Sequence, residues 1–314
     1  MIKTKSGVDD LMEQTIKIEE ELKENVTLPQ NGINATKVSR DLLVQSLLYM
    51  GSRSFSHFLN MTERYLQLLR NITSTQNDRI DLLRSLGRFL RFNTQNKKIY
   101  IDKLLQYRLI EPTDVIVWLF ESNDKDFPND VLPSEDNNEI DYSDIAFAEL
   151  LKTTLDKVNS RVLQTGQRLA MLKSENENQV AIERAKNTDM DINDEDNSVN
   201  EKNTNDNNLG IINAQNNYET VRRDQRECFV ILIQYFVSKL GNCDDLSDNL
   251  SEYDNDTWNK WFLWSYYRQF IRHYFLNVNE SIETIQAVAF ENVNEDDARY
   301  KLWKSNLTLN QRCN

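Results

Sequence analysis

Few residues of this chain have the type and spacing of a catalytic or metal-binding site. The two histidines, His57 and His273, each lack a second histidine or a cysteine at ligand spacing, which argues against a zinc site. The sequence has no glycine-rich phosphate-binding motif, no G-x-S-x-G and no H-E-x-x-H. His57 is better explained as a capped or half-buried helix residue than as a catalytic base. The sequence therefore predicts a protein that is not an enzyme and holds no cofactor or metal.

A cluster of basic residues is the first feature whose chemistry suits binding. Arg84, Arg88 and Arg91 are spaced i, i+4 and i+7, so they fall on one face of a helix, opposite its apolar stripe. Such a face could contact RNA phosphates or an acidic partner. Alternatively, it is a solvated helix face that pairs with the chain's own acidic loops, at 121–142 and 244–256. The candidate contact residues are Arg84, Arg88, Arg91, Lys97 and Lys98.

Aromatic residues interleaved with arginine form a second cluster between Trp258 and Phe275. Aromatic and arginine side chains together can stack on the bases of a nucleic acid. The same aromatics recur at helical spacing, however, which is how a helix fills a protein core. We favour core packing for this cluster.

The longest element expected to position such residues is a helical hairpin at about 150–235. Its first arm places apolar residues at alternating four- and three-residue steps, the spacing of a coiled-coil seam, and a matching ladder runs from Ala214 to Tyr235. The acidic, Asn-rich stretch between them cannot bury enough apolar surface to offset its ordering, so a disordered tip is expected at about 186–210. Paired arms of this kind usually hold or position another protein. The predicted partner-binding residues are Leu151, Leu155, Val158, Val162, Leu169, Leu172, Val221 and Leu232.

The composition predicts an all-α protein. Of 314 residues 39% are hydrophobic and 28% charged, which is globular, while seven glycines and four prolines are too few for the turns of an all-β fold. Apolar residues at helical spacing with short connections predict an α-solenoid of antiparallel helix pairs, HEAT-like, with an inserted coiled-coil hairpin. We expect an acidic segment and linker at 1–35 and one helical-repeat domain at 36–314. The expected helices outside the hairpin are 8–24, 36–51 with Thr36 as N-cap, 54–71, 78–92, 98–109, 113–121, 258–276, 281–293 and one around Trp303.

Charge and cysteine content narrow the class of partner and compartment. A formal net charge of −13 argues against a dedicated non-specific nucleic-acid binder, which is usually basic. The three cysteines, Cys228, Cys243 and Cys313, form no C-x-x-C motif and suit reduced thiols in the cytosol or nucleus. Neither an N-terminal secretory signal nor a run of 18 apolar residues is present, so we expect neither secretion nor a membrane span.

Four short motifs, taken in order, resemble one family. They are residues 43–48 (LVQSLL), 54–57 (SFSH), 115–120 (VIVWLF) and 229–236 (FVILIQYF), with an insertion between the last two. Their order and the place of the insertion are similar to the C-terminal domain of the large subunit of nuclear cap-binding complexes, over roughly residues 36–300. That domain is built like the middle domain of translation initiation factor 4G.

The resemblance implies a non-catalytic scaffold in the nucleus, with shuttling to the cytoplasm left open. It implies that a small RRM-containing subunit is the partner, that capped RNA is bound mainly through that subunit, and that factors for splicing, mRNA export and decay dock on the large subunit. The family's subunit is several times longer, so this chain is expected to be a fragment, with no evident import signal. The alternative function is a general helical-repeat adaptor in translation initiation or trafficking.

Overall fold

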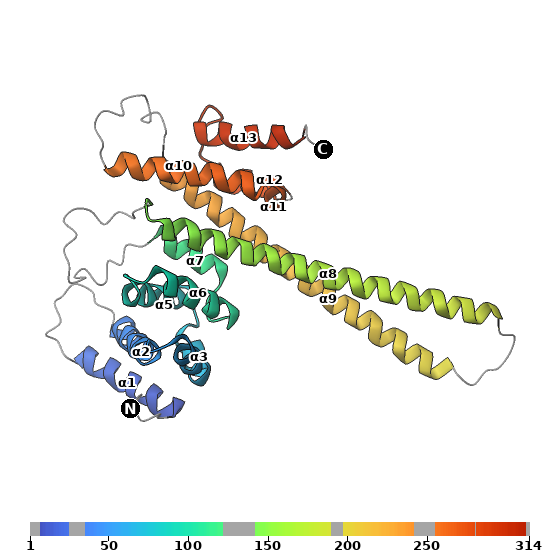
Figure 1. The fold of residues 1–314 in the computed structure, drawn as a ribbon, viewed down its shortest axis with the longest axis horizontal. Helices are drawn as coiled ribbons and strands as arrows, with labels where there is room; N and C mark the ends of the chain where they lie inside the picture. Colours follow the sequence, from blue (N-terminus) through green and yellow to red (C-terminus); the bar gives the residue numbers. More distant parts are fainter. Residues whose placement is uncertain are drawn as a thin grey trace. The chain divides into compact units, whose positions relative to one another are not determined.

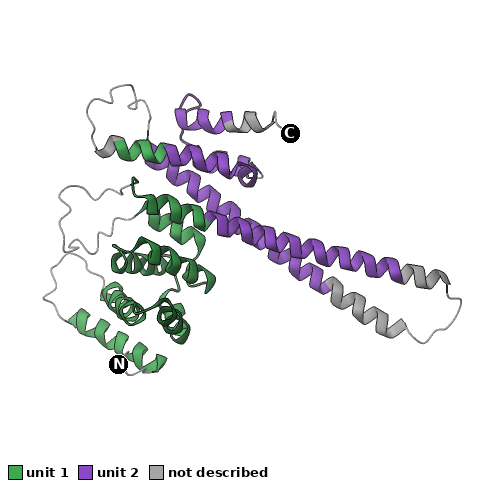
Figure 2. Cartoon of the chain, viewed as in Figure 1, with its two compact units in different colours: residues 1–154, 248–264 green, residues 155–247, 265–314 purple. Residues whose placement is uncertain are grey.

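The computed structural model describes residues 7–24, 35–121, 142–189, 197–241, 255–279 and 281–311, with side chains described except at 183–208, 255–257 and 306–311. Within these ranges the chain forms thirteen helices and no strand (Figure 1). The expected all-α helical solenoid is confirmed. The chain divides into two compact units, residues 1–154 with 248–264 and residues 155–247 with 265–314 (Figure 2).

The first unit is a series of helices that pack against one another, some next to each other in the sequence and some not. The helices are α1 (Val8–Glu24), α2 (Ala35–Gly51), α3 (Phe55–Arg64), α4 (Leu66–Ile72), α5 (Gln76–Phe89), α6 (Thr94–Gln106) and α7 (Pro112–Phe120). Helix α2 packs against α1, α3 and α5, and α5 packs in turn against α6 and α7. Apolar faces at helical spacing meet in a core. It includes four side chains that are fully buried, Leu68, Leu83, Ile116 and Phe120. Helix α1, which we had expected to belong to a separate segment, lies in this unit and buries Leu11.

Two helices that the sequence predicted as continuous are interrupted. The helix expected at 54–71 breaks at Tyr65, where the backbone leaves helical geometry (φ −104°, ψ 21°) and the side chain is buried. The helix expected at 258–276 ends at His273, and a short helix begins at Phe275. Neither break contains glycine or proline, so no local signal marks it. The N-cap predicted at Thr36 is also wrong, because α2 begins at Ala35 and the Thr36 hydroxyl donates to Glu19 Oε1 of α1 at 2.7 Å.

The second unit packs the ends of two long helices with the C-terminal helices. It contains most of α8 (Ile145–Asp189), all of α9 (Asn197–Leu240), the second half of α10 (Asn255–His273), and α11 (Phe275–Asn279), α12 (Ile282–Ala289) and α13 (Ala298–Gln311). Helix α12 packs against α9, and Phe236 of α9 lies 5.6 Å from Tyr267, ring centre to ring centre. Buried Arg299 donates to the backbone oxygen of Val237 at 2.6 Å, which links α13 to α9.

Helices α8 and α9 form the inserted hairpin (Figure 1). Asn159 pairs with Gln225 and Gly166 lies against Tyr218, so residue numbers rise along one arm as they fall along the other, and the arms are antiparallel. Helix α8 continues to Asp189 and α9 begins at Asn197. Parts of the range at about 186–210, which we expect to be disordered, are therefore helical. Residues 190–196 lie outside the described residues, and the disorder of the tip stays a prediction.

Candidate partner-binding surfaces

The seam of the hairpin is visible in the burial of its side chains. Between Arg161 and Ile182 of α8, Leu169 is the one buried residue of the described side chains, and the predicted positions Val162, Thr165 and Leu172 are half-buried among exposed neighbours. On α9 the predicted ladder behaves in the same way, with Val221 2% and Leu232 1% exposed. The alternating four- and three-residue pattern therefore identifies the face on which each arm is covered.

This burial changes how the predicted partner-binding residues can act. Leu151, Leu155, Val158, Leu169, Val221 and Leu232 are buried, and Val162 and Leu172 are half-buried. Because these side chains are covered, they support the arms, and a partner would meet the outward faces. The sequence prediction missed the exposed apolar residues on those faces, which fall between the seam positions. They are Leu163, Met171, Ile182, Leu209 and Ile212, each more than half exposed.

The predicted basic face is largely occupied by ion pairs within the first unit. Arg88 of α5 pairs with Asp41 of α2 at 2.5 Å, and Arg84 pairs with Asp81 at 2.9 Å. Arg40 of α2 reaches Asp78 at 2.7 Å. These acidic partners stand on the helices α2 and α5. The acidic loops lie almost entirely outside the described residues, so pairing with them stays a prediction.

The remaining basic candidates have different surroundings. Lys97 is half-buried, and burial lowers the pKa of its ammonium group, with the charge of Asp144 acting in the opposite sense. Lys98 pairs with Glu149 of α8. Arg91 is exposed, and its guanidinium lies 4.8 Å from the centre of the Phe92 ring. The five predicted cations therefore do not form one open basic surface, and Arg91 is the most accessible of them.

The aromatic residues of α10 divide between core and surface. Trp264, Tyr267 and Phe270 of α10 are buried, as core packing requires, and so is Tyr274 directly after the helix. By contrast, Trp258 and Trp261 near the start of α10 are 40% and 45% exposed and meet edge to face with ring centres 5.9 Å apart. The prediction of core packing holds for the later residues of the helix only.

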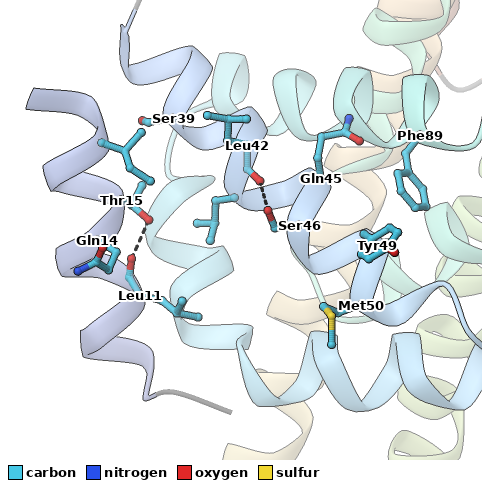
Figure 3. A pocket seen from close by; sticks show the side chains of 12 residues that line it. Leu11, Gln14, Thr15, Ser39, Leu42, Gln45, Ser46, Tyr49, Met50 and Phe89 are labelled. Carbon is cyan, nitrogen blue, oxygen red and sulfur yellow. Dashed lines mark hydrogen bonds between the residues drawn. The ribbon is translucent and has the colours of Figure 1, made fainter. Parts of the chain in front are cut away.

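A groove between α1 and α2 is a further surface feature, which the sequence did not reveal. It has a volume of about 690 Å³ and is lined by twelve residues, four from α1, seven from α2 and Phe89 of α5. Figure 3 shows Leu42 and Tyr49 on α2 across from Gln14 and Thr15 on α1. Leu42 and Tyr49 are 48% and 66% exposed, although both are large apolar side chains. The signal that would have found it is the presence of apolar residues on more than one face of α2, which runs ATKVSRDLLVQSLLYMG.

The described histidine and cysteine side chains considered for catalysis or metal binding have contacts that belong to the fold. The Nδ1 atom of His57 lies 2.7 Å from the Ser54 hydroxyl, which caps α3, as expected of a capped helix residue. Cys228 is a buried thiol at a seam position of α9, and Cys243 and Cys313 lie outside the described residues. Among the described side chains, no group of three His, Cys, Asp or Glu could hold a metal ion. No described helix has the length and apolar content to cross a membrane.

Comparison with known proteins identifies the family. The family described as "MIF4G like" matches residues 1–278. Similar proteins are the nuclear cap-binding protein subunits 1 of Oryza sativa (30% identical over 88 residues), Arabidopsis thaliana (28% over 94) and Schizosaccharomyces pombe (33% over 101). These alignments cover 28%, 30% and 32% of this chain, and 10%, 11% and 13% of the respective relatives. Because the family match spans most of the chain and agrees with the helical solenoid, the chain belongs to the MIF4G-like family.

Proposed function

We propose that this chain is a scaffold subunit of a nuclear cap-binding complex. The observation that carries the proposal is the family match over residues 1–278 together with relatives named nuclear cap-binding protein subunit 1. The all-α fold suits a scaffold, since packed helices present large surfaces to other proteins. The aligned stretches span about an eighth of the relatives at most, so the roles of the whole subunit are part of the proposal.

The proposed partner is a small RRM-containing subunit that holds the cap, with capped RNA reached mainly through it. Factors for splicing, export and decay of mRNA would dock on the assembled complex, in the nucleus. The hairpin is the proposed docking arm, with its seam residues supporting the outward faces. Arg91 is the best placed of the five predicted basic residues for contact with RNA or an acidic partner, because it is the exposed one among them.

A reconstitution experiment tests the proposal directly. The 314-residue chain is mixed with an RRM-type small cap-binding subunit and passed over 7-methylguanosine resin. We expect both proteins to be retained together and released by free 7-methylguanosine-capped dinucleotide, but not by its unmethylated counterpart. The chain alone, without the small subunit, serves as control and should pass through.

Two results would contradict the proposal in different ways. A chain that forms no complex with the small subunit would favour the alternative, a helical-repeat adaptor in translation initiation or trafficking. Retention of the chain without the small subunit would mean that it binds the cap itself.

In the assembled complex, Arg91→Glu should weaken RNA retention most at low salt if that side chain contacts phosphates.

A further inference from the structure

The groove between α1 and α2 has a lining that is entirely uncharged. The residues that line it are Leu11, Gln14, Thr15, Ile18, Ser39, Leu42, Leu43, Gln45, Ser46, Tyr49, Met50 and Phe89. Several are polar, yet their hydrogen bonds are directed into the protein. Thr15 donates to the Leu11 oxygen at 2.7 Å and Ser46 to the Leu42 oxygen at 2.7 Å, as the dashed lines of Figure 3 show. A hydroxyl bonded to its own helix presents mainly carbon outward, so this lining suits apolar side chains.

Three large apolar side chains in the groove remain exposed to water. Ile18 of α1 is 37% exposed, and Leu42 and Tyr49 of α2 are 48% and 66% exposed. Leu42 and Tyr49 are seven residues apart, two turns of helix, which corresponds to about 10 Å along α2. A second helix laid along the groove presents side chains at i, i+3 or i+4 and i+7 over the same length. The spacing of the exposed anchors therefore matches an amphipathic helix.

The charges near the groove favour a positively charged ligand. Helix α1 carries seven carboxylates and two lysines, and both lysines pair within the helix, Lys17 with Glu13 at 2.7 Å and Lys23 with Glu19 at 2.6 Å. Basic side chains of α2 and α5 near the other wall are engaged as well, since Arg40 pairs with Asp78 and Arg88 with Asp41. The residues of α1 that line the groove are uncharged, but the other faces of this helix carry a net negative charge, so a cationic ligand beside α1 gains from electrostatic complementarity.

We propose that this groove binds an amphipathic helix of a partner protein, with apolar side chains on one face and lysine or arginine beside them. Nucleic acid is a poor fit, because the lining offers no cation to phosphates and the nearby helix α1 is acidic. A second copy of this groove wall would likewise bring two acidic helices together. The proposal goes beyond the cap-binding role and does not depend on it.

A peptide-binding experiment on the full chain tests the proposal. The probe is a fluorescently labelled designed peptide of about 14 residues, with leucines at i, i+3, i+7 and flanking lysines. Its matched counterpart has glutamates in place of the lysines. We expect fluorescence anisotropy to show binding of the basic peptide, weakened by salt, and binding of the acidic peptide weaker by about tenfold or more.

Matched variants localise the binding. Leu42→Ser with Tyr49→Ser should weaken binding of the basic peptide by about tenfold, because both anchors are lost. Leu276→Ser is the control, since Leu276 is a 75% exposed leucine on α11 outside the groove, and it should leave affinity unchanged. Circular dichroism establishes that each variant keeps its helices.

Three results would overturn the proposal. Equal affinity for the acidic peptide would remove the electrostatic argument, and full affinity of the folded double variant would place binding elsewhere. Self-association of the chain that the double variant abolishes, measured by sedimentation, would make a second copy the occupant. None of these results bears on the cap-resin experiment, so the two proposals fail separately.

Discussion

The interior of the first unit and the arms of the hairpin are stabilised in different ways. In the first unit, helices contact neighbours on several sides, and Leu83, Ile116 and Phe120 are fully buried. In the arms, burial is confined to one face, and between Arg161 and Ile182 of the described side chains only Leu169 is buried. A side chain with neighbours on all sides contributes more apolar burial and leaves a larger cavity when it is removed. A substitution in the core of the first unit should therefore destabilise the whole unit, whereas one in the hairpin should open the arms locally.

Buried polar groups show the same contrast. The first unit buries a charge, Asp114 of α7, and surrounds it with donors: Arg79 Nε at 2.6 Å, Arg79 Nη2 at 3.3 Å and the backbone nitrogen of Glu111 at 2.7 Å. The hairpin seam instead uses a neutral amide pair, Gln225 with Asn159 at 2.6 Å. A buried charge is tolerable only with several good partners, whereas one amide pair in an apolar seam chiefly favours one register of the arms.

The largest effect is expected where the charge is buried. Asp114→Ala would remove the buried carboxylate from half-buried Arg79 and leave it the largely exposed Glu111, at 3.2 Å, and breaking such a buried pair costs about 3–5 kcal/mol. Urea denaturation followed by circular dichroism should show a large fall in the midpoint for the first unit. Asp102→Ala is the control, since that carboxylate is 51% exposed and 3.9 Å from Lys103, and it should change the free energy of unfolding by less than about 1 kcal/mol. Similar midpoints for the two variants would contradict the proposed role of burial.

Charges placed in the seam test whether the hairpin fails locally. Leu155→Asp with Leu169→Asp puts unpaired carboxylates at two buried positions, which costs several kcal/mol and should separate the arms. We expect the chain to stay helical, proteases to cleave the arms faster, and the small RRM subunit to bind more weakly if the hairpin is its docking arm. Leu163→Asp, at a 62% exposed position of the same helix, should change neither the helix content nor the rate of cleavage, because it leaves the seam intact.

The outcome of the seam variant distinguishes three situations. Global loss of helix by circular dichroism would show that the arms are as integral as the first unit. A folded variant that binds the small subunit with full strength would assign docking to the helical units. Local opening with weaker binding is the expected result.

The sequence predicted the helices and the seam because both depend on periodic apolar residues. The positions from Val162 to Leu172 and from Val221 to Leu232 followed from spacing alone, and their burial agrees. The breaks at Tyr65 and Tyr274 could not be predicted, since neither segment contains a helix-breaking residue and tertiary packing decides where the chain turns. The ion pair of Arg88 was missed for a related reason. Its acidic partner, Asp41, is more than 40 residues away, and spacing along one helix says nothing of a neighbouring helix. Arg84, by contrast, pairs with Asp81 three residues earlier on the same helix, which the spacing could have shown.

Two helical glycines allow the same substitution to be compared in both regions. A Cβ atom on Gly87 of α5 would lie 2.9 Å from the ring of Trp118, whereas one on Gly166 of α8 would lie 3.1 Å from the ring of Tyr218. Trp118 belongs to a helix packed in the first unit, so Gly87→Ala should destabilise that unit by about 1–3 kcal/mol through overpacking. Tyr218 is half-buried, as Trp118 is, but it stands on an arm that is covered on one face, so it can move by the few tenths of an ångström required.

Gly166→Ala is therefore expected to change stability by less than about 1 kcal/mol, because the helix preference of alanine offsets the contact. Thermal unfolding of the two variants beside the parent chain measures the difference. A larger loss at Gly166 than at Gly87 would mean that the arms are packed more tightly than the first unit.

The smallest expected effect concerns an ion pair in the second unit, where acid should act through one carboxylate. Asp297 accepts from Arg299 Nε at 2.9 Å and from Nη2 at 2.6 Å, and these hydrogen bonds hold the pKa of the Asp297 carboxyl below its ordinary value. A carboxyl whose pKa is lower in the folded state stabilises the fold above its unfolded pKa of about 3.9, and this contribution is lost as pH falls through the folded pKa. Asp297→Asn keeps the shape but removes the charge, and it should cost on the order of 1 kcal/mol at neutral pH. The difference between the two chains should shrink as the pH falls below about 4, which urea titrations at several pH values would measure. A difference that stays constant to the lowest pH would show that Asp297 supports the fold by packing and not by its charge.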